Sequence, residues 1–178
     1  MTQTPPPRFP HAPLERRAYA YLLDFVLVWL LSSLAGGILE FVIFTAAWFG
    51  LRVVVPSVNQ GQSLGTWAFD LKVINLRFRR LPGLLELSKR EGILGLASFL
   101  AMVGFNINFR NGISFLLFIA PLAADCGFAL TEDGFKQAFH DRIAETVVIA
   151  SRRGFSLDLR AKQFVRTLQT QWQNRQRR

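Results

Sequence analysis

The chain has 178 residues, a formal net charge of +9 and 51% hydrophobic residues, with a mean hydropathy of +0.25. Long apolar runs alternate with charged segments, which is typical of a small polytopic membrane protein rather than of a soluble domain. The single cysteine excludes an intrachain disulfide. Loops beside anionic lipid explain the basic charge, so we expect no nucleic-acid partner.

The N-terminal segment is rich in proline, and we expect residues 1–15 to form a disordered cytoplasmic tail. The first membrane span is predicted at 18–37, twenty residues with a single charge, Asp24. That length crosses a hydrocarbon layer of about 30 Å. A carboxylate at this depth costs about 2.5–3.5 kcal/mol on insertion scales, so Asp24 needs a partner.

Three further apolar runs follow the first span. Gly36 and Gly37 predict a tight turn, and the second run ends before Pro56, because proline disfavours helix in the residue before it. The four predicted spans are 18–37, 38–55, 92–109 and 113–130. The fold class expected is therefore an all-α membrane protein with four transmembrane helices.

The orientation follows from the distribution of Lys and Arg. If there are four spans, twenty of the twenty-one cations lie on one side, and Arg110 is the exception. Such an excess marks the cytoplasmic side. We expect a multi-pass protein with both termini in the cytoplasm.

The polar segments predict a small cytoplasmic subdomain. Ser63 is placed to cap a short interfacial helix, and a second interfacial helix is expected over 84–91 with a Glu86–Arg90 pair at i, i+4. Alternating β-branched residues predict a strand from Leu71 to Phe78 and another in 145–150. Since lone strands are marginal in water, we expect 71–75 and 146–149 to pair as a two-stranded β ribbon. Residues 151–178 are expected to form a basic amphipathic helix on anionic lipid head groups.

Three sequence blocks resemble motifs of the RDD family of small integral membrane proteins, which is named for one arginine and two aspartates. RRAYAYLLD supplies Arg17 and Asp24, and the second aspartate corresponds to Asp125 or Asp141. A second block, GQSLGTWAFDLKVIN, and a third, AFHDRIAETVVI, supply the other matching positions. These positions are Gly61, Gln62, Gly65, His140, Asp141, Ala144, Thr146, Val147 and Val148. The resemblance implies a membrane domain over about 16–150, and ion- or proton-coupled transport has been proposed for some members.

Two intramembrane acids are the main candidate site. Asp24 and Asp125 are expected at similar depth near the cytoplasmic face, where they can face one another. Two close carboxylates bind a cation or share a proton. The alternative is structural, in which each acid pairs with a neighbouring group such as Arg17, Arg142 or Tyr21.

Other motifs carry weaker signals. GQSLG matches the hydrolase pattern G-x-S-x-G, but that motif needs a strand-to-helix elbow and a histidine partner, and the sequence contains only His11 and His140. One adjacent His140–Asp141 pair does not make a metal site, although a titrating His140 can sense pH. We therefore expect no enzyme activity, metal or other cofactor. The function expected is ion- or proton-coupled transport, which at this size favours a homo-oligomer, and the alternative is a non-catalytic membrane scaffold with a basic cytoplasmic surface.

Overall fold

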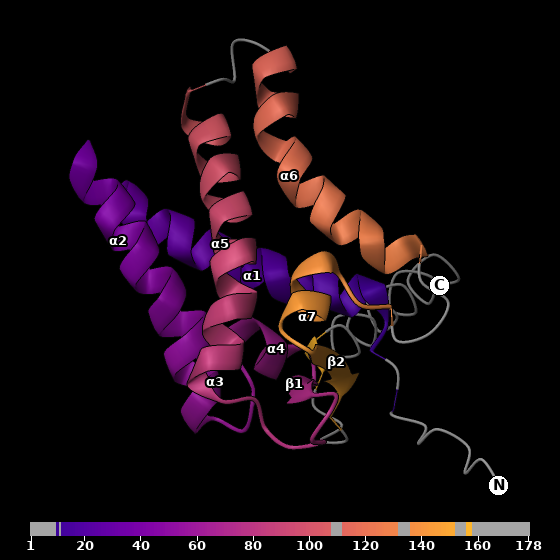
Figure 1. Cartoon of the computed structure of the whole chain (residues 1–178). Coiled ribbons are helices and arrows are strands. Elements are labelled where there is room, and N and C mark those ends of the chain that lie inside the picture. The colour runs from indigo at the N-terminus through magenta and orange to yellow at the C-terminus, as the bar shows by residue number, and fades with distance from the viewer. Residues whose placement is uncertain (1–9, 11, 108–111, 132–135, 152–155, 158–178) are drawn as a thin grey trace, which may run out of the picture.

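The structure is a computed structural model that describes residues 10, 12–107, 112–131, 136–151 and 156–157. Its longer helices are α1 (Leu14–Ser33), α2 (Ile38–Phe49), α5 (Leu84–Ile107) and α6 (Gly112–Thr131). The shorter elements are the π-helix η1 (Gly50–Val54), α3 (Val55–Val58), α4 (Leu64–Ala68), α7 (Phe139–Ile143), β1 (Leu71–Asn75) and β2 (Thr146–Ala150). The short helices and both strands gather at the lower end in Figure 1, and α2, α5 and α6 extend upward from them. The chain is therefore mostly helical.

The two strands form the predicted ribbon. β1 and β2 pair antiparallel, with Leu71 opposite Ala150 and Asn75 opposite Thr146. The first strand is shorter than predicted, because the Asn75 side chain accepts a hydrogen bond from the backbone N–H of Phe78 and turns the chain. The ribbon joins the segment after α4 to the segment after α7, as expected.

The second apolar run continues past its predicted end at residue 55. α2, η1 and α3 follow one another without a gap, so Pro56 lies inside the helical stretch, directly after the π-helix. The stretch Ile38–Val58 has 21 residues and a mean hydropathy of 2.0. Within the described part of the chain it is the one helix long and apolar enough to cross a membrane, and Phe115–Thr131 is a shorter apolar helix.

The third apolar run is not a separate element. One helix, α5, replaces the interfacial helix expected over 84–91 and the span expected from 92. The sequence predicts a break between these two segments at Gly92. The helix continues instead, because Arg90 and Glu91 are buried and paired with each other, so this charged turn need not reach water. The prediction of a Glu86–Arg90 pair is wrong, since Glu86 accepts a hydrogen bond from Asn75 and Arg90 forms ion pairs with two other acids.

The helices pack around an aromatic core. Phe25 and Val28 of α1 meet Phe44 and Trp48 of α2 and Leu94 of α5, with rings of Phe25 and Phe44 in edge contact. A second cluster joins Ala20 of α1 to the ribbon. The start of α1 at Leu14 shortens the predicted tail of residues 1–15, while the expected helix over 151–178 lies almost wholly outside the described residues.

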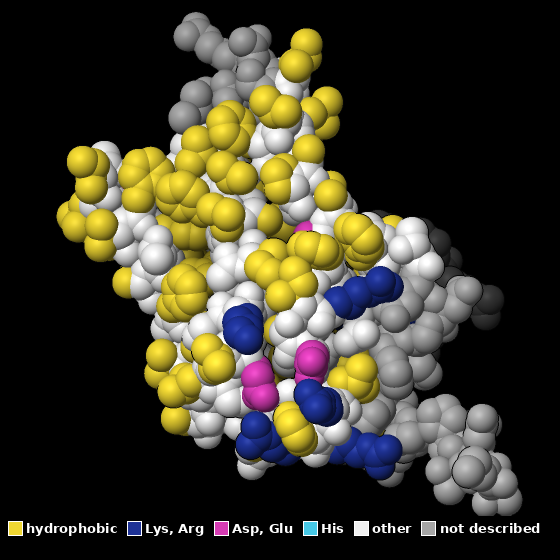
Figure 2. Space-filling model, in the orientation of Figure 1, with side chains coloured by type: hydrophobic (Ala, Val, Ile, Leu, Met, Phe, Trp, Pro, Cys, Tyr) yellow, Lys and Arg dark blue, Asp and Glu magenta, His cyan; other side chains and the backbone are white. Residues whose placement is uncertain are grey.

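Large apolar side chains remain exposed on the outer helix faces. Leu34 and Ile38 near the α1–α2 turn are 85% and 81% exposed, and Ile113 at the start of α6 is 87% exposed. Figure 2 shows hydrophobic side chains over the upper part of this face and the Lys, Arg, Asp and Glu side chains near the lower end. Contiguous exposed apolar surface of this kind marks contact with a membrane or another protein.

Candidate functional site

Asp24 is fully buried and fully hydrogen-bonded. Its Oδ2 accepts from Arg52 Nη1 at 2.7 Å and from the Ser63 hydroxyl at 2.6 Å. Its Oδ1 accepts from the backbone N–H of Gly65 at 2.7 Å. These hydrogen bonds tie α1 to η1 and to the start of α4, so Asp24 is a structural anchor for α4 on α1.

Gly65 allows that anchor to form. A Cβ at this position would lie 2.0 Å from the Ala20 carbonyl oxygen and 2.9 Å from the Asp24 carboxyl carbon. The backbone of α4 therefore touches α1 directly. Ser63 caps α4 as predicted, since its hydroxyl accepts from the N–H of Thr66.

Arg52 belongs to the π-helix η1, and its side chain lies between two acids. Besides Asp24, it donates from Nε to Glu91 Oε2 at 2.7 Å and from Nη2 to Oε1 at 3.3 Å. Its guanidinium carbon is 5.1 Å from the centre of the Trp48 ring and 5.8 Å from that of Tyr21. Local π-helical turns are frequent at functional sites, and here the turn places a buried arginine.

The pairing continues from Glu91 to α7 and to the start of α1. Arg90 donates from Nη1 to Glu91 at 2.6 Å and from Nε to Asp141 Oδ1 at 2.8 Å. Arg17 donates from Nη2 to Asp141 Oδ2 at 2.6 Å and from Nη1 to the Lys136 carbonyl. We call this alternating chain the ion network. Its members are Asp24, Arg52, Glu91, Arg90, Asp141 and Arg17, three acids and three arginines.

His140 and Asp125 form a second buried pair beside the ion network. Asp125 Oδ2 lies 2.5 Å from Nδ1 of His140, and its Oδ1 accepts from the His140 backbone N–H at 2.9 Å. The other ring nitrogen, Nε2, is 3.5 Å from Asp141 Oδ1. One histidine thus lies between two carboxylates.

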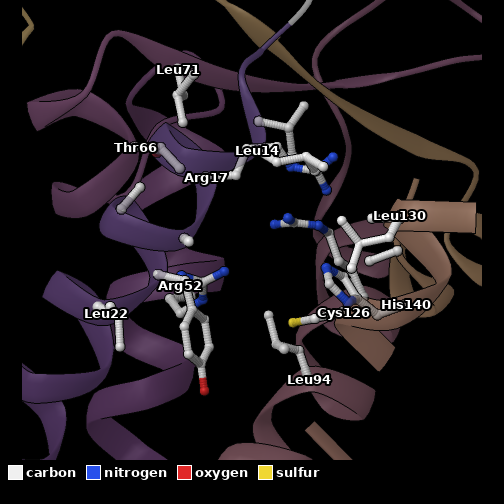
Figure 3. Close-up of a pocket in the computed structure, with 17 residues that line it drawn as sticks. Leu14, Arg17, Leu22, Arg52, Thr66, Leu71, Leu94, Cys126, Leu130 and His140 are labelled. Atoms are coloured by element: carbon white, nitrogen blue, oxygen red, sulfur yellow. The ribbon is translucent and has the colours of Figure 1, made fainter. Parts of the chain in front are cut away.

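A cavity of about 370 Å³ lies between α1 on one side and α6 and α7 on the other. Figure 3 shows the side chains of Arg17, Arg52 and His140 around it, together with Cys126 and several leucines. Arg90 and Tyr21 also line it. The described lining residues include three arginines and a histidine but no Asp or Glu, because the acids lie behind the bases.

Comparison with known protein families gives one match. The model of the RDD family matches residues 11–145. The chain belongs to the RDD family. Searches of curated proteins and of solved structures give no match. The family and the apolar helix Ile38–Val58 together identify a membrane protein.

The structure gives the two candidate acids different partners. Asp24 and Asp125 were expected to face one another, but each has a different basic partner, Arg52 and His140. Both aspartates contact the short helices, Asp24 through α4 and Asp125 through α7. Position along a helix does not give the direction of a side chain around the helix axis, so their partners could not be predicted. Arg17, one of the neighbours offered as a partner for these two acids, binds Asp141 instead.

The remaining RDD motif positions support the ribbon. Gly61 has φ +78°, and its carbonyl accepts from Val73 N–H at 2.9 Å. Gln62 donates to the Leu71 carbonyl at 2.6 Å, and Thr146 is fully buried with its hydroxyl 3.4 Å from Asp141. Among the residues described, no three His, Cys, Asp or Glu side chains are grouped to hold a metal ion.

Sequence reasoning missed Arg52 and Glu91 as site residues, and it assigned Arg90 to a different pair. Both lie at the ends of apolar runs, where charges are usually exposed to water. The sequence did contain a signal for Arg52. A buried acid in the first span needs a cation at a similar depth, and Arg52 lies near the inner end of the next span.

Asp141 makes the stability of this site sensitive to acid. Burial raises the pKa of the Asp141 carboxyl, but the charges of His140, Arg90 and Arg17 outweigh it and hold the pKa well below its ordinary value. A lowered pKa contributes stability that is complete above the ordinary value of about 3.9 and is lost as pH falls through the folded value.

We therefore expect the free energy of unfolding to fall below about pH 4. The change Asp141→Asn should lower stability near neutral pH and reduce this acid slope, as measured by denaturation in mild detergent. The exposed acid in Glu15→Gln is the control and should leave the slope unchanged. An Asp141→Asn protein with the wild-type slope would contradict the assignment.

Proposed function

We propose that this RDD protein moves protons across the membrane together with a second solute, through the His140–Asp125 pair and the cavity beside it. The proposal keeps the transport role implied by the family resemblance and moves its centre from Asp24 to His140. It assigns no catalytic chemistry to the chain. The observation that carries it is a histidine held between two carboxylates on a cavity wall.

The proposed topology has four spans, α1, the stretch Ile38–Val58, α5 and α6, with both termini in the cytoplasm. Exposed leucines along α1 and α6 support it, because lipid covers such side chains. The excess of Lys and Arg around the short elements at the lower end supports the same orientation. Charged first turns in α1 and α5 lie beside the ion network, at the membrane boundary of this arrangement.

The groups around His140 favour exchange of a proton. Histidine is the side chain that most readily changes its charge near neutral pH. Asp125 and Asp141 face its two ring nitrogens, and Arg17 of α1 and Arg90 of α5 line the same cavity. Cys126 also faces the cavity from α6. Charged groups of both signs therefore surround the histidine to which the proposal assigns the proton step.

Asp24 is a poor proton carrier by comparison. Both of its oxygens accept hydrogen bonds from fixed donors, and its side chain is fully buried. Protonating it would leave Arg52 short of a partner. Its role in the proposal is to hold α4 and η1 in place.

The test is proton flux into liposomes that contain the purified protein and a pH-sensitive dye. We expect His140→Asn to reduce flux by at least about tenfold, since asparagine keeps a hydrogen-bond donor but cannot take up and release a proton. His11→Asn, which alters the other histidine of the sequence, is the matched control and should retain flux. Wild-type flux in a folded His140→Asn protein would overturn the proposal.

A second candidate is a non-catalytic scaffold that holds partner proteins at the membrane. It is favoured by the ion network, which joins α1, η1, α5 and α7 and explains most of the buried charge by structure alone. Oligomeric state in mild detergent helps to separate the two. A strict monomer would count against transport, because one 178-residue subunit hardly encloses a pathway.

A further inference from the structure

The polar end of the cavity has hydrogen-bond donors to spare. Arg17 uses Nη1 and Nη2, and Arg90 uses Nε and Nη1. In the described part of the chain, Nε of Arg17 and Nη2 of Arg90 have no acceptor. Arg52 differs, since all three of its nitrogens are bonded. Free guanidinium edges on a cavity suit a carboxylate or a phosphate.

The rest of the cavity is apolar. Leucine and alanine side chains supply most of the wall; they include Leu14, Leu22, Leu94, Ala129 and Leu130. A volume of about 370 Å³ is within the range of ligand sites, which are usually apolar with a few placed polar groups. A soluble anion would satisfy the arginines and leave this apolar surface uncovered.

The cavity opens sideways between two helices. Among its lining residues, Leu22 of α1 is 50% exposed and Leu130 of α6 is 75% exposed. Ala18 and Cys126 are also exposed on these two helices. In the proposed topology this opening faces the edge of the bilayer near the cytoplasmic surface. A ligand can therefore enter from lipid.

We propose that the cavity binds a single-chain anionic lipid, with its head group at Arg17 and Arg90 and its acyl chain leaving between Leu22 and Leu130. The inference rests on the proposed function for the orientation of the cavity, and it names the class of solute that occupies it. An anion placed against Arg17 and Arg90 also lies beside His140, which lines the same cavity. This gives the proton step and the lipid a common site.

The chain contains its own reporter of occupancy. Cys126 is the single cysteine of the sequence and lines the cavity. In nanodiscs of phosphatidylcholine, the rate of maleimide labelling at Cys126 measures how open the cavity is. We expect lysophosphatidic acid to slow labelling at concentrations at least about tenfold lower than lysophosphatidylcholine requires, because only the first offers an unshielded anionic head to the arginines. Inorganic phosphate should give no protection.

A matched pair of variants tests the route of the chain. Leu130→Trp narrows the opening and should abolish protection by lysophosphatidic acid. Leu117→Trp adds the same side chain at an exposed α6 position (73% exposed) that does not line the cavity, and it should keep protection. Neither change removes a buried contact.

Three results would overturn the inference: equal protection by lysophosphatidylcholine, protection by inorganic phosphate, or unchanged protection in Leu130→Trp. Protection by lysophosphatidic acid without measurable proton flux would support the lipid site and reject the transport proposal. Flux that depends on His140, without protection at Cys126, would support the transport proposal and reject the lipid site.

Discussion

Replacing Arg52 by glutamine is expected to lower the free energy of unfolding by about 3–5 kcal/mol, the usual result of breaking a buried ion pair from one side. Arg52 is 4% exposed and bonds both Asp24 and Glu91, which are fully buried. Its loss leaves two fully buried carboxylates with fewer donors. Packing on Trp48 and Tyr21 is lost at the same time. Thermal or denaturant unfolding in mild detergent measures the change.

Two controls separate this effect from general damage. Adding Glu91→Gln to Arg52→Gln removes one of the stranded charges, so the double variant should recover part of the loss. Arg80→Gln breaks an ion pair with Glu86 in which the arginine is 64% exposed, and it should cost less than about 1 kcal/mol. Equal effects of Arg52→Gln and Arg80→Gln would contradict a buried network.

Replacing Gly65 by alanine is expected to cost at least about 3 kcal/mol, at the upper end of overpacking effects. The added Cβ would lie 2.0 Å from a backbone oxygen of α1, which cannot rotate away. Relief requires α4 to move, and that movement pulls the Gly65 N–H from Asp24. The yield of folded protein and its melting temperature both report the change.

Gly36→Ala is the matched control for the same substitution. A Cβ at Gly36 meets no atom within 4 Å, and its φ does not require glycine. We expect a change within about 0.5 kcal/mol, as for most surface substitutions. Similar losses in both variants would show that α4 does not contact α1 as described.

The elements of the fold were predictable from the sequence wherever tertiary burial did not oppose the local preference. Strands 71–75 and 146–150 alternate, cannot stand alone and are both outside the apolar runs, so their pairing was predictable. Ser63 before an apolar helix start predicted its cap. The boundaries at Pro56 and Gly92 were wrong, because tertiary burial of Arg52, Arg90 and Glu91 overrode the local preference for a break.

The partners within the site could not be predicted from spacing. Asp24 and Arg52 are 28 residues apart, and a π-helical turn sets the direction of Arg52. Asp141 and Arg17 are 124 residues apart and are brought together by tertiary packing, which also places α1 against the ribbon. The sequence identified five of the eight residues in the two buried clusters as candidates; these are Arg17, Asp24, Asp125, His140 and Asp141.

Proton flux per folded molecule, compared between Asp125→Asn and Asp24→Asn in liposomes, tests most directly whether the working pair is His140–Asp125. We expect Asp125→Asn to fold and lose flux, because His140 loses the carboxylate that contacts its Nδ1. Asp24→Asn should lower the folded fraction, while the molecules that do fold keep wild-type flux. Loss of flux in folded Asp24→Asn, with flux retained in Asp125→Asn, would contradict the assignment of roles to the two aspartates.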